Sequence, residues 1–202
     1  MSRLAEVVRR AVDVVVAATL LLLLSPVLLL VAVLVRVRMG APVLFRQQRL
    51  GLREQPFQLL KFRSMHAPAP GQEGPEFDDL RLGRLGRILR ASSLDELPSL
   101  VNLLRGEISL VGPRPLPVHY LPRFTTHQRR RFEVKPGITG LAQVSGRNAV
   151  DWPERLALDV RYVEQRSLRL DASLLLRTVP LLLRRTGIDH ADGVTMTELP
   201  PQ

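Results

Sequence analysis

The residues best suited to chemistry are two adjacent carboxylates, Asp95 and Glu96, in the run SLDELP at positions 93–98. A carboxylate attacks a diphosphate only when the phosphate charge is screened by arginines and a hard cation. Glu96, with Asp95 beside it, can hold Mg²⁺ while substrate oxygens and water complete the octahedron. The pair therefore predicts catalytic and metal-binding residues for phosphate chemistry.

Several arginines could supply the screening that such chemistry requires. Arg114 follows the carboxylates along the chain, and Arg90 and Arg147 flank the same region. Pro113 and Pro115 restrict the backbone on both sides of Arg114, which lowers the entropy lost when its guanidinium grips phosphate. Taken alone, each arginine is more often a solvated surface charge.

The carboxylate pair also has a purely structural interpretation. Ser93 and Glu96 have the spacing of a capping box, in which each side chain satisfies an orphan amide of the other, while Asp95 favours the helix dipole. Because a helix N-terminus also attracts anions, a phosphate could rest at the same place. Both interpretations predict that a helix begins at Ser93.

Composition limits the classes of function. The chain has 202 residues, which suit one compact domain plus an anchor. It has no cysteine, which excludes disulfides and thiolate metal sites. The net charge of +10 favours an acidic partner, namely anionic lipid, nucleic acid or a phosphorylated substrate.

An apolar run at positions 14–35 contains no charged residue and is just long enough to cross a hydrocarbon core. Ser25 and Pro26 lie at its middle, where proline removes a helical hydrogen bond and a serine hydroxyl can satisfy the freed carbonyl. Arginines flank both ends, which favours a helix that bends and returns over one that spans. We expect Asp13, near the entrance, to pair with an arginine at the interface. A cleaved signal peptide, a straight span and a buried helix remain alternatives.

The rest of the chain reads as a small mixed domain. A turn separates two strand-like segments, which predicts a β-hairpin. A loop rich in proline and glycine follows, and then several helices, the last of which is too short to span a membrane and could lie at its interface. The expected elements are a hairpin over 43–50 and 56–64, a loop over 66–76, helices from 79 to 90, from Ser93, from Asp151 and from Asp171, and a turn-rich segment over 134–140.

Together these motifs resemble those of the bacterial sugar transferases, the monotopic phosphoglycosyl transferases. The match covers nearly the whole chain in the right order. The motifs that carry it are Arg10-x-x-Asp13, Ser25-Pro26, residues 61–65, 93–98, 109–115 and 135–140, and Gly146-Arg147-Asn148.

The resemblance implies a mostly helical α+β fold for a monotopic membrane protein. Residues 1–38 would form a re-entrant helix-break-helix with its break at Ser25 and Pro26. Residues 39–202 would form a cytosolic transferase domain with a short β-hairpin and interfacial amphipathic helices. The catalytic domain would then lie on the cytoplasmic face of the bacterial inner membrane.

The resemblance also implies an activity: a ping-pong transfer of phosphosugar from a UDP-sugar to polyprenyl phosphate, with release of UMP. It makes Asp95 the nucleophile and Glu96 the Mg²⁺ ligand. The tail over 187–196 is similar to that of members acting on UDP-linked N-acetylated sugars, but it departs at Leu199, where an aromatic residue is expected. We assign substrate and phosphate binding to Lys61, Arg63, Arg90, Pro113, Arg114, Pro115 and Arg147.

The expected partners are a UDP-sugar, polyprenyl phosphate and membrane lipids, with Mg²⁺ as cofactor and without nucleic acid. A rival hypothesis is a non-catalytic, membrane-anchored basic protein that binds anionic lipid or nucleic acid through its arginines. Such a binder has no need of Asp95 and Glu96, and salt should weaken its binding broadly.

Overall fold

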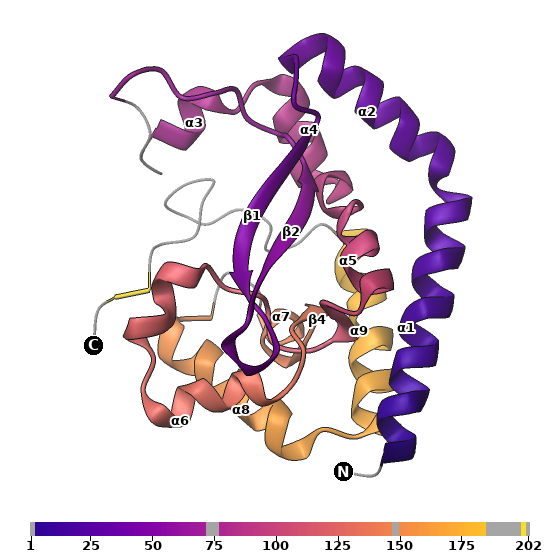
Figure 1. Ribbon diagram of the computed structural model, residues 1–202, viewed down its shortest axis with the longest axis vertical. Helices are drawn as coiled ribbons and strands as arrows, with labels where there is room; N and C mark the ends of the chain where they lie inside the picture. The colour runs from indigo at the N-terminus through magenta and orange to yellow at the C-terminus, as the bar shows by residue number, and fades with distance from the viewer. Residues whose placement is uncertain (1–2, 72–76, 147–149, 185–198, 201–202) are drawn as a thin grey trace.

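The computed structural model describes residues 3–71, 77–146, 150–184 and 199–200 (Figure 1). Its α-helices are α1 (Arg3–Leu23), α2 (Ser25–Met39), α3 (Asp78–Arg81), α4 (Arg84–Ala91), α5 (Ser99–Arg105), α6 (Thr126–Arg129), α7 (Leu141–Val144), α8 (Trp152–Gln165) and α9 (Leu168–Arg184). Its strands are β1 (Leu44–Leu50), β2 (Pro56–Phe62), β3 (Ser109–Val111) and β4 (Gly137–Thr139). Its 3₁₀ turns are η1 (Leu52–Glu54), η3 (Leu94–Glu96), η4 (Val118–Arg123) and η5 (Arg130–Glu133). The fold is mostly helical, as expected.

The N-terminal apolar run forms two helices that meet at the predicted break. The axes of α1 and α2 differ by 64°. Pro26 has no amide hydrogen to donate to Leu22, and the hydroxyl of Ser25 donates to that carbonyl at 2.8 Å instead. No single described helix is long and apolar enough to span a bilayer, but α1 and α2 together meet that test.

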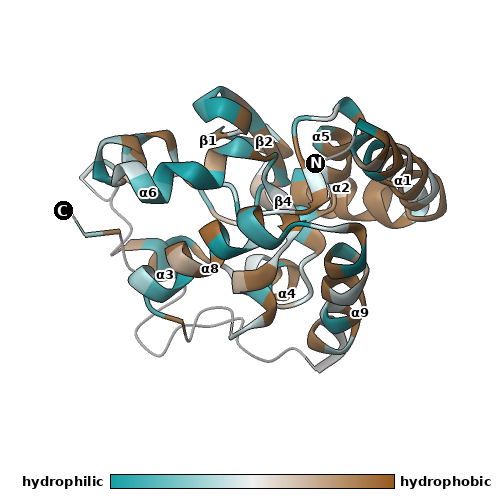
Figure 2. Ribbon diagram, turned by 90° about the horizontal axis from the view of Figure 1, so that it is seen from below, coloured by the Kyte–Doolittle hydropathy of each residue, from teal (hydrophilic) through white to brown (hydrophobic). Residues whose placement is uncertain are grey.

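Apolar side chains around the bend face outward. Leu22, Leu23 and Leu29 are 76%, 67% and 67% exposed. In Figure 2 both helices carry mostly the hydrophobic colour along one side of the molecule. An exposed apolar surface of this kind marks an interaction site.

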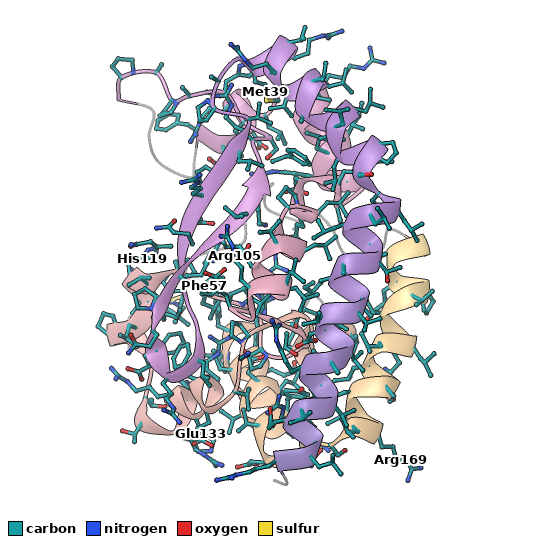
Figure 3. All side chains as sticks on the ribbon, turned by 45° about the vertical axis from the view of Figure 1, so that its right-hand side comes forward. Met39, Phe57, Arg105, His119, Glu133 and Arg169 are labelled. Atoms are coloured by element: carbon teal, nitrogen blue, oxygen red, sulfur yellow. The ribbon has the colours of Figure 1, made fainter. Side chains whose placement is uncertain are left out.

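The opposite side of α1 packs against the rest of the domain. Ala17 is fully buried and contacts the cluster that contains Leu100 and Leu103 of α5. Figures 1 and 3 show α9 beside the first half of α1, where Arg9 and Asp171 form a buried ion pair of 2.6 Å. The first helix therefore packs against the rest of the described chain.

Asp13 lies on this buried side of α1. The charge of the nearby Arg10 acts on it, as expected of an arginine partner, but its hydrogen bonds come from other residues. Its carboxylate accepts hydrogen bonds from the hydroxyl of Ser109, at 2.9 Å, and from the amide of Leu110, also at 2.9 Å. The neighbouring Arg10 donates to the carbonyl oxygens of Leu103 and Leu104 instead. This motif thus joins α1 to the end of α5 and the start of β3.

The predicted hairpin is confirmed. β1 and β2 pair antiparallel, with Leu44 opposite Phe62 and Leu50 opposite Pro56. Asn102 of α5 is fully buried against β2, where its side chain accepts from the amide of Leu60 and donates to the carbonyl of Gln58. Asn102 therefore fixes α5 against the strand that carries Lys61.

A second pair of strands was not predicted. β3 and β4 run parallel, with Ser109 opposite Gly137 and Val111 opposite Thr139. The segment interpreted from sequence as turn-rich therefore contains a strand, because Gly137 and its neighbours pair with the residues that precede Pro113. A three-residue strand is too short for alternation to reveal it.

Two of the predicted helix boundaries need correction. The helix expected over 79–90 is divided into α3 and α4, because Leu82 has extended backbone and Gly83 forms the N-cap of α4. The last helix starts at Leu168, ahead of Asp171, and continues through Pro180. The start of α8 is confirmed, since Asp151 accepts from the amide of Glu154 at 2.9 Å. Part of the proline- and glycine-rich loop, residues 72–76, lies outside the described residues.

Candidate active site

Asp95 and Glu96 lie on η3, the single turn between α4 and α5. Ser93, just before it, has left-handed backbone with φ of 56° and makes no capping hydrogen bond. The capping-box interpretation, with a helix beginning at Ser93, is therefore wrong, and α5 begins only at Ser99. Glu96 therefore does not cap a helix, and its carboxylate contacts Lys61 of the hairpin instead.

Glu96 is held by two cations from distant parts of the chain. One of its oxygens, Oε1, accepts from the ammonium of Lys61 at 2.7 Å and from the guanidinium of Arg114 at 3.2 Å. These two positive charges hold the pKa of Glu96 far below its usual range. Glu96 is therefore ionised throughout the physiological pH range.

Asp95, the neighbouring residue, has the opposite electrostatic setting. It is only 7% exposed. Burial raises its pKa above the usual 3.8, and the charge of Glu96 adds to this, while Lys61, Arg90 and Arg114 act in the other direction. Two adjacent carboxylates whose pKa values are pushed apart are typical of catalytic pairs.

The backbone of Arg114 is fixed by hydrogen bonds on both sides. The amide of Gly137 donates to the carbonyl of Pro113 at 2.9 Å, and the buried guanidinium of Arg131 donates to the carbonyl of Arg114 at 2.7 Å. At Gly112 an added Cβ would lie 2.4 Å from the carbonyl oxygen of Lys135, so only glycine fits this approach. The strand pair thus aims Arg114 at Glu96.

Arg131 belongs to a buried charge pair that sequence reasoning missed. It lies 2.7 Å from Asp159 of α8, and both side chains are 2% exposed. Spacing could not reveal the pair, because its members come from separate elements. A weak signal was available, since Asp159 lies on the apolar side of α8 with Leu156 and Val160, where a charge must have a partner.

Arg49 of β1 was also missed. Its guanidinium donates to the carbonyl of Pro115 at 3.2 Å. Burial, with the nearby charge of Arg114, lowers its pKa to about 10, so it remains charged at neutral pH. Beside it lies a shallow hollow that Asp95 does not line; its lining residues are Arg49, Leu59, Lys61, Glu96, Ser99, Ile108, Arg114, Pro115, Gly137 and Ile138.

The remaining predicted phosphate-binding arginines have different positions. Arg90 lies near Asp95 and donates to the hydroxyl of Ser64 at 3.1 Å. Arg63 is not brought to the group, because its guanidinium donates to carbonyl oxygens of the α2–β1 connection, including that of Ala41 at 2.9 Å. Arg147 lies outside the described residues.

Asp95 and Glu96 have the oxygen ligands that Mg²⁺ prefers. The described residues contain no group of three or more acidic, histidine or cysteine side chains placed to hold a metal ion. Mg²⁺ does not need one, because it commonly takes one or two carboxylates and completes its shell with water and substrate phosphates. Asp95 and Glu96 fit such a partial site, in which the substrate supplies the remaining oxygens.

A family model described as bacterial sugar transferase matches residues 4–185, which include α1, η3 and Arg114. The chain belongs to the bacterial sugar transferase family. The match starts within the first helix and continues into α9, so the bent helix pair and the carboxylate site both fall inside the family's own boundaries.

Individual relatives agree with this assignment. The uncharacterized sugar transferase EpsL of Bacillus subtilis is 45% identical over 189 residues, covering 94% of each chain. The UDP-glucose:undecaprenyl-phosphate glucose-1-phosphate transferase of Caulobacter vibrioides is 45% identical over 186 residues, 87% of this chain and 69% of that protein. The exopolysaccharide production protein ExoY of Sinorhizobium fredii is 37% identical over 196 residues, 89% of this chain and 87% of that protein.

Proposed function

We propose that this sugar transferase moves a phosphosugar from a UDP-sugar to polyprenyl phosphate, releasing UMP and forming a polyprenyl diphosphate sugar. The family assignment supports a phosphoglycosyl transferase activity. The names of relatives from Caulobacter vibrioides and Klebsiella pneumoniae describe transfer of glucose 1-phosphate from UDP-glucose to undecaprenyl phosphate. The reaction would be an early step in building a glycan on a lipid carrier.

One observation carries the proposal: Asp95 and Glu96 are adjacent but have opposite electrostatic settings. Glu96 forms ion pairs with Lys61 and Arg114, whereas Asp95 is buried with a raised pKa. A desolvated carboxylate is the better nucleophile because it has lost its stabilising hydration. This contrast supports Asp95, and not Glu96, as the attacking group.

The proposed reaction has two displacements at one phosphorus. A carboxylate oxygen of Asp95 attacks the β-phosphorus, the bond to the bridging oxygen breaks, and UMP leaves with that oxygen. A phosphate oxygen of the polyprenyl phosphate then attacks the same phosphorus and releases the Asp95 carboxylate. Lys61, Arg90 and Arg114 would neutralise charge on the phosphate oxygens in both steps.

We propose Mg²⁺ as the cofactor, held by Glu96 and Asp95. When bound, this cation would offset charge on the diphosphate that two nearby carboxylates would otherwise repel. Lys61 and Arg114 keep Glu96 ionised, as a metal ligand must be.

We further propose that α1 and α2 form a re-entrant membrane helix, with the catalytic domain on the cytoplasmic face. The 64° bend and the exposed apolar side chains around it support this placement. Arginines at both ends, including Arg36 and Arg38 in the last turn of α2, fit a segment whose two ends lie at one surface.

The identity of the sugar is a separate proposal. The expectation of an N-acetylated sugar rests on residues 187–196, which lie outside the described residues. Relatives carry names that specify glucose or galactose. We retain an N-acetylated sugar as the proposal, to be tested by UMP release against a panel that includes UDP-glucose, UDP-galactose and their N-acetylated counterparts.

The deciding experiment uses the purified protein with UDP-sugar and Mg²⁺ but no lipid acceptor. We expect a stoichiometric burst of UMP, and an increase in intact mass of one phosphosugar located at Asp95. Asp95→Asn should give neither signal. A strict requirement for lipid before any UMP appears would favour direct transfer, and binding of anionic lipid without any turnover would favour the non-catalytic rival.

A further inference from the structure

A groove separate from the carboxylate site lies between α2 and α4. It has a volume of about 270 Å³ and is lined by Leu34 and Arg38 of α2 and by Arg84, Leu85 and Ile88 of α4. Figure 1 shows the two helices close together at the end of the molecule away from the N-terminus, near Met39, which Figure 3 labels. The groove thus adjoins the second half of the bent helix pair.

The floor of the groove is apolar and partly open to solvent. Leu85 packs against the buried cluster of Val31, Val35 and Leu89, so the groove has a fixed base. Ile88 is 54% exposed and Leu34 is 38% exposed, although both are large aliphatic side chains. Such a surface is suited to a hydrocarbon chain.

The two arginines on the groove are exposed and have no ion pair or hydrogen bond within the described part of the chain. Arg38 lies in the last turn of α2, where a cation complements the helix dipole. Arg84 lies in the first turn of α4, which has no acidic residue, and there a cation opposes the dipole. Helix stability therefore does not account for Arg84, whereas an anion between the two guanidinium groups does.

We propose that this groove binds one anionic phospholipid. Arg38 and Arg84 hold its phosphate, and an acyl chain lies on Leu34, Leu85 and Ile88. Charge selects the occupant, because the apolar floor alone would accept any lipid while the arginines prefer an acidic headgroup. The inference rests on the proposed membrane placement of α2.

The phosphate held here is distinct from the reacting phosphate. Arg84 and Arg90 are at opposite ends of α4, about 9 Å apart along a helix axis with about 1.5 Å rise per residue. Arg90 is the member of α4 whose charge acts on Asp95. A lipid in the groove therefore anchors α4 and α2 to the bilayer while the site beyond Arg90 stays open to substrate.

The test is native mass spectrometry of the full-length protein in a neutral detergent. Phosphatidylglycerol and phosphatidylcholine are added in turn, and the fraction of protein retaining one lipid is compared. Arg38→Gln with Arg84→Gln should lower retention of phosphatidylglycerol about tenfold and leave phosphatidylcholine unchanged. The matched control is Arg105→Gln with Arg161→Gln, which removes two exposed arginines outside the groove and should retain phosphatidylglycerol as the parent does.

A second variant tests the floor. Ile88→Ser should lower retention of phosphatidylglycerol about threefold. UMP release in neutral detergent should stay unchanged in all variants, so loss of the lipid site is distinguishable from loss of the catalytic function. Equal retention of both lipids by the parent, or an equal loss in the control variant, would overturn the proposal. So would displacement of phosphatidylglycerol by an equimolar amount of polyprenyl phosphate, since the groove would then be the acceptor site.

Discussion

The ammonium of Lys61, at the end of β2, lies 2.7 Å from a carboxylate oxygen of Glu96 on η3. This ion pair joins the hairpin to the turn that carries both acidic residues. It also separates their pKa values. The charge of Lys61 lowers the pKa of Glu96, but it only partly offsets the rise that burial causes in the pKa of Asp95. Adjacent residues of the same chemical type therefore contribute to stability with opposite signs.

Replacing Asp95 with Asn should stabilise the folded protein. Asp95 has a folded-state pKa above its unfolded value, so its ionised form costs stability at neutral pH. Asp95→Asn removes that charge and should raise the thermal midpoint by roughly 2–4 °C, corresponding to about 1 kcal/mol in a chain of this size. Thermal unfolding in neutral detergent with chelator at pH 7 measures this, and a lowered midpoint would contradict it.

Glu96→Gln should do the opposite. The folded-state pKa of Glu96 is depressed, so its stabilising contribution is present above its usual pKa of 4.5 and is lost as the pH falls below that value. The variant should therefore melt below the parent at pH 7, and the gap should begin to narrow only below about pH 4.5 and keep shrinking as the pH falls further. A gap that is constant with pH would mean that packing, and not charge, explains the effect.

Lys61→Met should shift the pH dependence of catalysis. If Asp95 is the nucleophile, it must be ionised to attack, so the UMP burst should fall at acid pH with a midpoint above the usual 3.8 of an aspartate. Because Lys61 lowers the pKa of Asp95, its removal should move this midpoint to higher pH and reduce the burst rate about 100-fold. The control is Arg46→Met, an exposed arginine on β1, whose profile should match the parent's.

The buried pair of Arg131 and Asp159 predicts a separation of stability from activity. Asp159→Leu leaves Arg131 charged and unpaired, which should destabilise the protein by about 3–5 kcal/mol. Adding Arg131→Met should recover much of that loss, since replacing both ions with apolar groups is often neutral. Turnover should not recover with it, because the carbonyl of Arg114 has lost its donor. Chemical denaturation and UMP release measure the two effects, and parallel recovery of both would refute the positioning role.

Asp13→Ala should loosen α1 from the domain. It leaves the part-buried amide of Leu110 and the buried hydroxyl of Ser109 without their acceptor, at a cost of about 1–3 kcal/mol. Ser109→Ala removes only one of the two donors and should cost about 1 kcal/mol. Equal losses in the two variants, measured by thermal unfolding in detergent, would show that the Leu110 amide bond contributes nothing.

The topology of α1 and α2 can be tested with single cysteines, because the chain has none. If the pair is re-entrant, Ser2→Cys and Ala41→Cys should both be shielded from a membrane-impermeant thiol reagent in intact cells and both react after permeabilisation. Labelling of only one from outside would mean a true span. Pro26→Ala should convert a fraction of molecules to a straight span by restoring the helical hydrogen bond to Leu22, with activity falling by that fraction.

Local chemistry is the part that the sequence predicted well. Pro26, the turn between the two strands of the hairpin, and the N-cap at Asp151 each act through residues a few positions away, so pattern alone revealed them. The helix start predicted at Ser93 was wrong for the converse reason. Its spacing to Glu96 fits a capping box, but Glu96 forms ion pairs with Lys61 and Arg114, which are distant in the sequence. The strand pair β3 and β4, and the burial of Arg131 and Asp159, depend on contacts between distant segments, which no local pattern encodes.

The hydrogen bonds of Asp13 have a consequence for how the protein is made. Its partners lie 96 residues further along the chain, so at synthesis rates of about 5–20 residues per second the helix must wait roughly 5–20 s for them. During that interval the carboxylate has neither Ser109 nor the Leu110 amide to accept from, and water and the nearby charge of Arg10 on the same helix stabilise it. If α1 inserts into a membrane, the charge of Asp13 opposes deep insertion until Ser109 and Leu110 have been made, so anchoring and folding would be completed together.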